Sequence, residues 1–312
     1  MQARYVSLRP LLLWQHVERP IDWTQRFGRQ APLWVEIGFG NGEFLARQAQ
    51  EHPEYDFIGI EPEWASMQRC LRRLAQARVT NVRLLLLDAR VALQRLFAPQ
   101  TLQQVYALFP CPWPKERHVK HRLFAQSFLA LLNSRLRAEA EVQVVTDHQE
   151  YLTWVLEQVP DTGFTPHWST IPARFSTKYE RKWQASGQQE FYDLRLRKST
   201  PLASPLLEDV TLQTHRIAQF TPEAFTLPTR HGDITVTCKD FLYDPRQHRG
   251  MVWVFVAEDG LTQDFWIEIA RSQSGWSIRP ARGCGIVPTV GVQQALDLVR
   301  DAAQQSPPAL HA

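Results

Sequence analysis

The sequence predicts an α/β fold, with a doubly wound parallel sheet in residues 1–200 and a smaller α+β domain in residues 201–312. Three observations support this prediction. Apolar runs alternate with amphipathic helical patterns in the first part, as in parallel strands joined by crossover helices. A proline-containing stretch, residues 199–208, reads as a linker that interrupts this pattern. After it, apolar and polar residues alternate one by one, which is typical of antiparallel strands.

The first strong strand signal ends in a glycine-rich loop. A short apolar run contains Glu36, and Gly38, Gly40 and Gly42 follow at alternate positions. Glycine readily adopts positive φ, so the loop can bring its peptide groups against a ligand at the carboxyl end of a strand. A dinucleotide fingerprint would have its third glycine where this chain has Glu43. The spacing therefore favours a ligand without a pyrophosphate, for which S-adenosylmethionine is the nearest common candidate; a simple strand-to-helix turn is the alternative.

Two further apolar runs, residues 55–61 and 82–88, also end in acidic residues, Glu61 and Asp88. Glu61 lies close to the offset of about 20 residues at which an acidic side chain binds ribose hydroxyls. The carboxyl ends of parallel strands meet at one edge of a sheet. Three acidic residues at that edge predict a cofactor pocket.

Composition sets broad limits on the class of protein. Of the 312 residues, 44% are hydrophobic and 21% are charged, as in soluble globular proteins. The apolar run at residues 11–14 is too short for a signal peptide and no stretch could span a bilayer, so we expect a cytoplasmic protein. The four cysteines are scattered without a CxxC pair, which indicates neither a zinc site nor a disulfide framework.

The formal net charge of +3 conceals an asymmetry between the two parts of the chain. Residues 201–312 contain 9 Lys and Arg against 12 Asp and Glu, whereas residues 1–200 contain 26 against 20. The basic excess thus lies in the expected cofactor domain. This is compatible with nucleic-acid binding, although a solvated basic surface is the simpler alternative.

A proline-rich segment follows the expected strand at residues 104–109. Its prolines, at positions 110, 112 and 114, flank Cys111 and Trp113 and hold the backbone extended. The segment leads into a basic cluster made of Lys115, Arg117, His118, Lys120, His121 and Arg122. Cations beside a tryptophan predict phosphate binding together with base stacking. An ordinary basic loop is the alternative.

The remaining pattern of the first domain completes the expected sheet. A long amphipathic helix starts near residue 123, and the fifth strand, 141–147, ends in Thr146-Asp147. A helix over 149–159 follows. Residues 175–183 read as a polar, aromatic and basic loop, and an alternating strand over 190–198 closes the sheet.

These motifs, in this order, resemble the bacterial-type tRNA guanine-N7 methyltransferases over roughly residues 20–198, about the length of a doubly wound domain. The matching segments are Glu36–Gly42, Gly59–Glu61, Asp88-Ala89, Phe109–Lys115 with Arg117, His118 and Lys120, Thr146-Asp147 and Thr177–Glu180. The resemblance implies a Rossmann-like class I methyltransferase fold. It also implies S-adenosylmethionine as cofactor and N7 of a guanosine in tRNA as methyl acceptor.

The resemblance also assigns roles to individual residues. The cofactor would be bound by Glu36, Gly38, Gly40, Gly42, Glu61, Asp88 and Cys111. The guanosine and its neighbourhood would be held by Lys115, Asp147, Thr177, Lys178, Tyr179 and Glu180. The tRNA backbone would meet Arg117, His118, Lys120, His121 and Arg122.

One position departs from the family pattern. The family normally has an active-site aspartate between the first two prolines, where this chain has Cys111. A neutral thiol cannot balance the positive charge that develops on a methylated purine, so the departure predicts activity that is reduced or retargeted. Two alternatives remain: a non-catalytic RNA-binding protein that keeps the fold, and a nucleophilic cysteine, since a Pro-Cys pair also resembles that of cytosine-C5 methyltransferases.

The second domain has no catalytic signal. Alternating runs at 233–238, 251–256 and 264–269 predict antiparallel strands, and a helix over 292–303 would cover them. RNA binding, dimerisation and binding of a separate partner all remain open for this domain, as does the oligomeric state.

Overall fold

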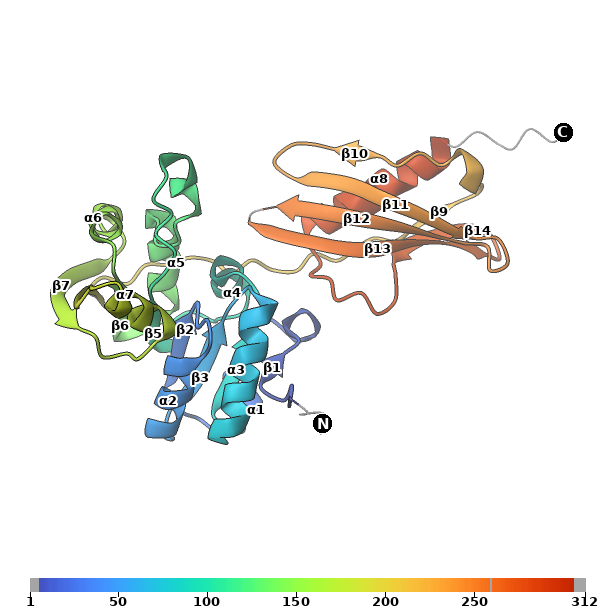
Figure 1. The fold of residues 1–312 in the computed structure, drawn as a ribbon. Coiled ribbons are helices and arrows are strands. Elements are labelled where there is room, and N and C mark those ends of the chain that lie inside the picture. The colour runs from blue at the N-terminus through green and yellow to red at the C-terminus, as the bar shows by residue number, and fades with distance from the viewer. Residues whose placement is uncertain (1–5, 259, 306–312) are drawn as a thin grey trace. The chain divides into compact units, whose positions relative to one another are not determined.

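The computed structural model describes residues 6–258 and 260–305. The chain divides into two compact units, Met1–Leu207 and Glu208–Ala312 (Figure 1). The first unit contains the predicted parallel sheet and the second an antiparallel sheet.

The first unit alternates strands and helices along the chain. Its strands are β1 (Leu11–Leu12), β2 (Leu33–Ile37), β3 (Asp56–Ile60), β4 (Val82–Leu85), β5 (Leu102–Leu108), β6 (Leu136–Thr146), β7 (Phe164–Pro172) and β8 (Glu190–Lys198). Its helices are α1 (Trp23–Phe27), α2 (Glu43–Glu51), α3 (Trp64–Ala77), α4 (Ala89–Arg95), α5 (Gln126–Arg135), α6 (Gln149–Gln158) and α7 (Lys178–Ala185), with the 3-10 turns η1 (Trp14–His16) and η2 (Glu116–His121).

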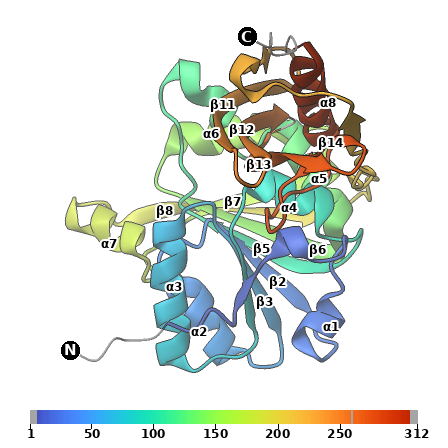
Figure 2. The same ribbon diagram turned by 90° about the vertical axis from the view of Figure 1, so that its right-hand side faces the viewer.

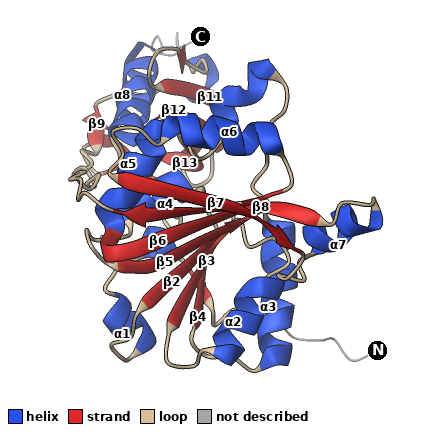
Figure 3. Cartoon of the chain, turned by 90° about the vertical axis from the view of Figure 1, so that its left-hand side faces the viewer, coloured by secondary structure: helices blue, strands red, loops and turns tan. Residues whose placement is uncertain are grey.

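The eight strands form one sheet in the order β1-β4-β3-β2-β5-β6-β8-β7. The strands from β1 to β6 pair in parallel, and β8 runs antiparallel to both β6 and β7. Figure 3 shows α2 and α3 on one face of the sheet and α4, α5 and α6 on the other. The predicted doubly wound architecture is confirmed. The strand order reverses between β2 and β5, and the carboxyl ends of strands at such a switch point form the usual ligand crevice of α/β sheets.

Polar side chains cap the amino ends of α1 and α4. The Asp22 carboxylate accepts from the backbone N–H of Gln25 at the start of α1, and the Asp88 carboxylate caps α4 by accepting from the N–H of Arg90 at 2.7 Å. Such caps satisfy N–H groups that have no partner within the helix. Asp88 is therefore a helix cap and not a strand end: β4 stops at Leu85, three residues before the predicted end.

Other elements also differ from the sequence prediction. The sheet has two additional strands: β1, which is only two residues long, and β7, whose residues are mostly exposed and so gave no apolar signal. Residues 175–183 were predicted as a loop, but Lys178–Ala185 form α7, which projects from the edge of the unit in Figure 2 and Figure 3. The helix α5 begins at Gln126 and not near residue 123.

The stretch predicted as a linker, residues 199–208, is largely attached to the first unit. Arg135 is fully buried, and its guanidinium donates hydrogen bonds to the carbonyls of Leu93, Ser204 and Pro205. A buried guanidinium requires such acceptors, because an unpaired one is very unfavourable. The compact unit consequently extends to Leu207 and not to residue 200.

The second unit is a six-stranded sheet with a helix on one face. Its elements are β9 (His215–Ile217), η3 (Pro222–Ala224), β10 (Thr229–Arg230), β11 (Thr235–Asp244), β12 (Arg249–Glu258), β13 (Leu261–Ser272), β14 (Gly275–Pro280) and α8 (Val290–Gln305). The three predicted strands and the terminal helix are present but longer. Alternate residues of β12, such as Val252 and Val254, pack against Val292 and Leu296 of α8. Among the described residues, no helix is long and apolar enough to cross a membrane.

Candidate functional site

The site lies where β2 and β5 end side by side. Residues 38–42 follow β2, and residues 109–113 follow β5, its parallel neighbour in the sheet. Gly38, Gly40 and Gly42 have φ values of 72°, 52° and 67°, all in the left-handed region. The glycine loop therefore has the conformation for which its glycines were singled out.

The glycines serve two different needs. A Cβ atom at Gly38 or Gly40 would meet nothing within 4 Å, so only their backbone angles call for glycine. A Cβ atom at Gly42 would lie 2.3 Å from the Sγ of Cys70. Gly42 thus lets α2 begin directly against α3, where Cys70 is a buried packing residue.

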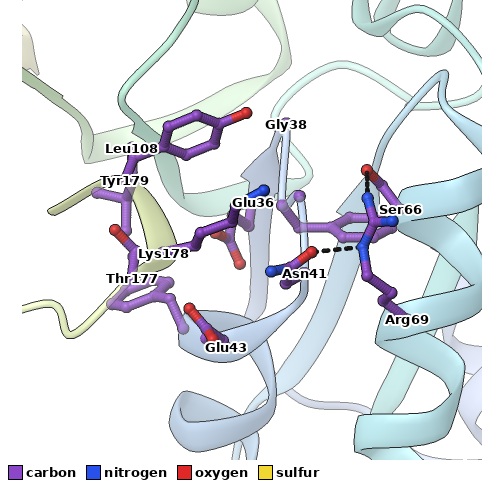
Figure 4. Close-up of a pocket in the computed structure, with 13 residues that line it drawn as sticks. Glu36, Gly38, Asn41, Glu43, Ser66, Arg69, Leu108, Thr177, Lys178 and Tyr179 are labelled. Carbon is purple, nitrogen blue, oxygen red and sulfur yellow. Dashed lines mark hydrogen bonds between the residues drawn. The ribbon is translucent and has the colours of Figure 1, made fainter. Parts of the chain in front are cut away.

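Two adjoining cavities open at this edge of the sheet. Figure 4 shows the smaller, where Thr177, Lys178 and Tyr179 face the glycine loop. The larger has a volume of about 530 Å³, within the range of small-molecule sites. Its lining includes Gly38, Gly40, Glu61, Asp88, Cys111, Trp113, His121, Asp147, Tyr179 and Trp183. Because Gly38, Gly40 and Tyr179 line both, the two cavities form one crevice.

Glu36 is the most perturbed acidic group of the crevice. Its residue is 4% exposed, and its Oε2 atom has no hydrogen-bond partner among the described residues. Burial raises the pKa of Glu36 to about 8, and the neighbouring charge of Glu61 adds to the effect, against the backbone N–H of Leu45 and the charge of Arg47. A buried, unpartnered carboxyl oxygen at a cavity wall is a strong site for a ligand donor.

Glu61 braces the glycine loop from β3. Its Oε2 accepts from the N–H of Gly40 at 3.0 Å, and its Oε1 accepts from the N–H of Glu63 at 3.1 Å. Burial raises the pKa of Glu61, and these two hydrogen bonds act in the opposite direction. The carboxylate therefore holds the loop as well as lining the larger cavity.

Asp147 lies in the same cavity as Cys111, at the carboxyl end of β6. Burial raises the pKa of Asp147, whereas the nearby His148 and Lys182 favour its ionised form. The Cys111 side chain is exposed. The structure thus places one carboxyl group and one thiol together at the position where strands β5 and β6 end.

The backbone around Cys111 is held in an uncommon conformation. Phe109 and Trp113, on either side of the Pro-Cys-Pro sequence, have φ values of 57° and 42°. Left-handed angles at bulky residues cost roughly 1–3 kcal/mol each and cluster at functional sites. The N–H of Phe109 donates to the carbonyl of Val145 at 2.7 Å, which anchors this segment to β6.

The basic cluster separates into two groups. Lys115, Arg117 and Lys120 are exposed, while the rings of His118 and His121 pack against Trp113 at centroid distances of 5.6 and 5.3 Å. His121 also lines the larger cavity, but Lys115 lines neither cavity. These side chains are accessible to an RNA backbone.

Arg122 does not fit the RNA-binding role predicted for it. It is 7% exposed, its Nε donates to the carbonyl of Pro112 at 2.8 Å, and its guanidinium lies 5.0 Å from the ring centroid of Trp154. Arg122 therefore ties the proline-rich segment to α6. The sequence placed it in a run of cations, and only the packing of the segment shows that it points inward.

Glu180 likewise differs from its predicted role in substrate binding. The residue is 1% exposed, and its carboxylate accepts the backbone N–H groups of Arg174, Phe175 and Ser176. These contacts fix the turn that leads into α7, which Thr177 caps. Glu180 thus positions its neighbours and does not face the crevice. Tyr179 is 46% exposed and lines both cavities.

Several lining residues were not anticipated from the sequence. Arg69 and Ser66 of α3 line the smaller cavity, and the Nε of Arg69 donates to the side-chain oxygen of Asn41 at 2.5 Å (Figure 4). Trp183 lines the larger cavity one helical turn after Tyr179. These two aromatic residues are four positions apart, a spacing that places side chains on one face of a helix. The sequence indicated this shared face only if the segment was taken to be helical.

Several known proteins have sequences similar to that of this chain. A family described as "Putative methyltransferase" matches residues 30–193. A tRNA (guanine-N(7)-)-methyltransferase of Chlorobium phaeobacteroides is 44% identical over 165 residues, covering 53% of this chain and 81% of the relative. A protein of the same name from Thermotoga maritima is 35% identical over 205 residues, covering 64% of both chains.

A third relative extends the similarity beyond the first unit. The tRNA (guanine-N(7)-)-methyltransferase of Thermus thermophilus is 34% identical over 261 residues, covering 82% of this chain and 84% of the relative. That alignment is longer than the first unit, which ends at residue 207, so it reaches into the second. The chain therefore belongs to the tRNA (guanine-N(7)-)-methyltransferase family, and its first unit has the Rossmann-like class I methyltransferase fold.

Proposed function

We propose that this protein transfers a methyl group from S-adenosylmethionine to N7 of a guanosine in tRNA. The proposal rests chiefly on the unpartnered, buried carboxyl of Glu36 at the wall of a crevice that also holds Asp147 and Cys111. Relatives at 34–44% identity carry the name of this activity. Because tRNA is the proposed partner, the cytoplasm is the proposed location.

The residues present fit S-adenosylmethionine. An ammonium group placed at Glu36 would give its Oε2 atom a donor and return the carboxyl to its usual ionised state. Glu61 lies at the end of the neighbouring strand, where an acidic residue accepts from ribose hydroxyls in this fold class. The backbone of Gly38 and Gly40, which carry no side chains, lines both cavities of the crevice.

The chemistry demands alignment more than proton transfer. S-adenosylmethionine, when bound, supplies the methyl group from its sulfonium centre. Guanine N7 has a free lone pair, so no base is needed to remove a proton, and the protein must hold the purine in line with the methyl group. Positive charge develops on the purine during transfer. Asp147 is the carboxyl that shares the cavity with Cys111 and can offset this charge.

The aromatic side chains of α7 suit a purine base. Tyr179 and Trp183 both line the larger cavity and can stack on the guanine ring. Thr177 and Lys178 line the adjoining smaller cavity. We assign contacts with the tRNA backbone to Lys115, Arg117, Lys120 and the histidines of η2 (His118, His121), and assign Arg122 and Glu180 to positioning roles because both are buried.

Two alternative functions depend on the chemistry of Cys111. If the neutral thiol weakens transfer, the protein is a slow or retargeted enzyme or an RNA-binding protein without activity. If instead the thiol is a nucleophile, cytosine is the target base, because its ring must be attacked before C5 can be methylated. The exposure of Cys111 is the observation that keeps the second reading open.

The decisive experiment measures methyl transfer from labelled S-adenosylmethionine to unmodified bulk tRNA, followed by nucleoside analysis. We expect 7-methylguanosine from the wild type and from Cys111→Ser, and a higher kcat from Cys111→Asp, which adds a carboxylate near the developing charge. Absence of product with the cofactor still bound would refute the proposal. Formation of 5-methylcytosine, lost in Cys111→Ser and trapped covalently on RNA containing 5-fluorocytosine, would support the nucleophile instead.

A further inference from the structure

A separate cavity, which is basic, lies at the amino ends of the strands in the sheet of the first unit. Its volume is about 380 Å³, and we call it the arginine pocket because Arg9, Arg29, Arg78 and Arg83 line it together with Asp56. Asp56 is the first residue of β3, whereas the crevice described above lies at the carboxyl ends of the strands. The length of β3, about 13 Å, separates the arginine pocket at its first residue from the crevice at its carboxyl end.

The pocket has an excess of positive charge that the described residues do not neutralise. Among the described residues that line the pocket, Asp56 is the only carboxylate; it is paired with Arg29 at 2.7 Å and its charge also acts on Arg83, so one negative charge faces four guanidinium groups. Arg83 donates only to the backbone carbonyls of Thr80, Val82 and Arg26. Carbonyl acceptors satisfy its N–H groups but leave its full charge.

Two of the arginines are free to meet a ligand. The side chains of Arg9 and Arg78 are exposed, and neither has a hydrogen-bond or ion-pair partner within residues 6–258 and 260–305. Burial lowers the pKa of Arg83, and the positive charge of Arg9 lowers it further, against the opposite effect of Asp56. An anion in the pocket would relieve this repulsion.

The backbone of the pocket is well fixed. Arg83 lies over the ring of Phe27 at 4.6 Å, and the side-chain amide of Asn81 donates to the carbonyls of Ala49, His52 and Tyr55. These contacts join the amino ends of β3 and β4 to the helices around them. Arg83 is therefore presented by a fixed strand, whereas Arg9 and Arg29 lie in the neighbouring loops and Arg78 directly follows the last residue of α3.

We propose that the arginine pocket binds phosphate groups of a polynucleotide backbone, at a second contact region for the tRNA named in the proposed function. Guanidinium groups bind phosphate with paired hydrogen bonds and retain their charge at all physiological pH values. A polynucleotide can reach both edges of the sheet at once, whereas a mononucleotide cannot. The basic excess of residues 1–200 agrees with this occupant.

The test uses the full-length protein with Arg9→Ala/Arg78→Ala. The matched control, Arg137→Ala/Arg246→Ala, removes two exposed arginines outside the pocket and causes the same change in net charge. Binding of unmodified bulk tRNA is measured without cofactor by fluorescence anisotropy over a series of KCl concentrations. Calorimetry with S-adenosylmethionine checks that the crevice is intact in each variant.

We expect the pocket variant to bind tRNA about tenfold more weakly at 0.1 M KCl, with the slope of log K against log[KCl] reduced by roughly 1–2. The control should change the slope by less than half as much, and cofactor affinity should not change in either. A pocket variant that matches the control overturns the proposal. Loss of binding to free tripolyphosphate with tRNA binding unchanged also overturns it, in favour of a small anionic ligand.

This inference rests on the proposed function for the identity of its RNA, but the two can fail separately. A protein that binds tRNA through Arg9 and Arg78 but makes no 7-methylguanosine refutes the proposed function and supports the pocket. If the protein makes 7-methylguanosine but the pocket variant binds tRNA with unchanged affinity, the proposed function is supported and the arginine-pocket proposal is refuted.

Discussion

Replacing Glu36 with glutamine should stabilise the fold at pH 8 while weakening cofactor binding. Burial raises the pKa of this carboxyl from 4.5 to about 8. The unfolded chain loses the Glu36 proton above pH 4.5, whereas the folded chain keeps it until about pH 8. The unfolded state thus binds fewer protons between these values, and the free energy of unfolding falls as pH rises through this interval.

The size of the effect follows from the two pKa values. At 1.36 kcal/mol per pH unit, the wild type loses roughly 3 kcal/mol of stability between pH 5 and pH 8 through Glu36 alone. Glu36→Gln is neutral at both pH values and escapes this loss. For a unit of about 200 residues, this corresponds to roughly 6–12 °C in melting temperature. The melting temperature of Glu36→Gln minus that of the wild type should therefore be larger at pH 8 than at pH 5 by this amount.

Scanning calorimetry at pH 5 and pH 8 measures this difference for the transition of the first unit. Glu190→Gln removes an exposed carboxylate of the same unit and serves as the matched control, for which we expect a change within about 0.5 kcal/mol at either pH. Equal offsets of Glu36→Gln from the wild type at both pH values would refute the reasoning, because they would mean that Glu36 ionises normally in the folded protein. Calorimetric titration with S-adenosylmethionine should show weaker binding by Glu36→Gln, since the amide offers no charge to an ammonium group.

Two further predictions concern residues that shape the crevice. Gly42→Ala should lower the free energy of unfolding by roughly 2–4 kcal/mol, because its Cβ would lie 2.3 Å from the Sγ of Cys70. Gly38→Ala should lower it by only about 1 kcal/mol, through its left-handed φ, because its Cβ would meet no atom within 4 Å. Urea unfolding measures both losses, and equal losses would contradict the packing argument. Glu180→Ala should raise the KM for tRNA about tenfold and speed hydrogen exchange at the N–H of Ser176, because three buried or partly buried backbone N–H groups lose their acceptor. Glu180→Gln retains one acceptor oxygen and should be affected less; a variant Glu180→Ala with unchanged exchange would contradict the positioning role.

The local features of the crevice were predictable because they depend on backbone geometry. Alternating glycines readily adopt the positive φ angles of a tight loop beside a strand, and the structure has all three at positive φ. Acidic residues that end parallel strands must meet at one edge of the sheet, and Glu61 and Asp147 do line one cavity. The prolines around Cys111 predicted an extended segment, but they did not indicate the left-handed residues Phe109 and Trp113.

The direction of individual side chains was decided only by the tertiary structure. Arg122 belongs to a run of cations in the sequence, but the carbonyl of Pro112 and the ring of Trp154 hold it inside. Glu180 belongs to a polar segment, but it turns inward to accept three backbone N–H groups.

The boundary between the two units was also a tertiary outcome. A proline-containing stretch reads as a linker from its composition, yet the buried Arg135 holds Ser204 and Pro205 against the first unit. The sequence by itself determined the alternation of strands and helices from residue 33 to residue 159, the glycine loop and the place of the crevice, because these follow from hydrophobic periodicity and backbone geometry. Only the tertiary structure decided which charged side chains face a ligand and which satisfy buried backbone groups, because that choice depends on acceptors far away in the sequence.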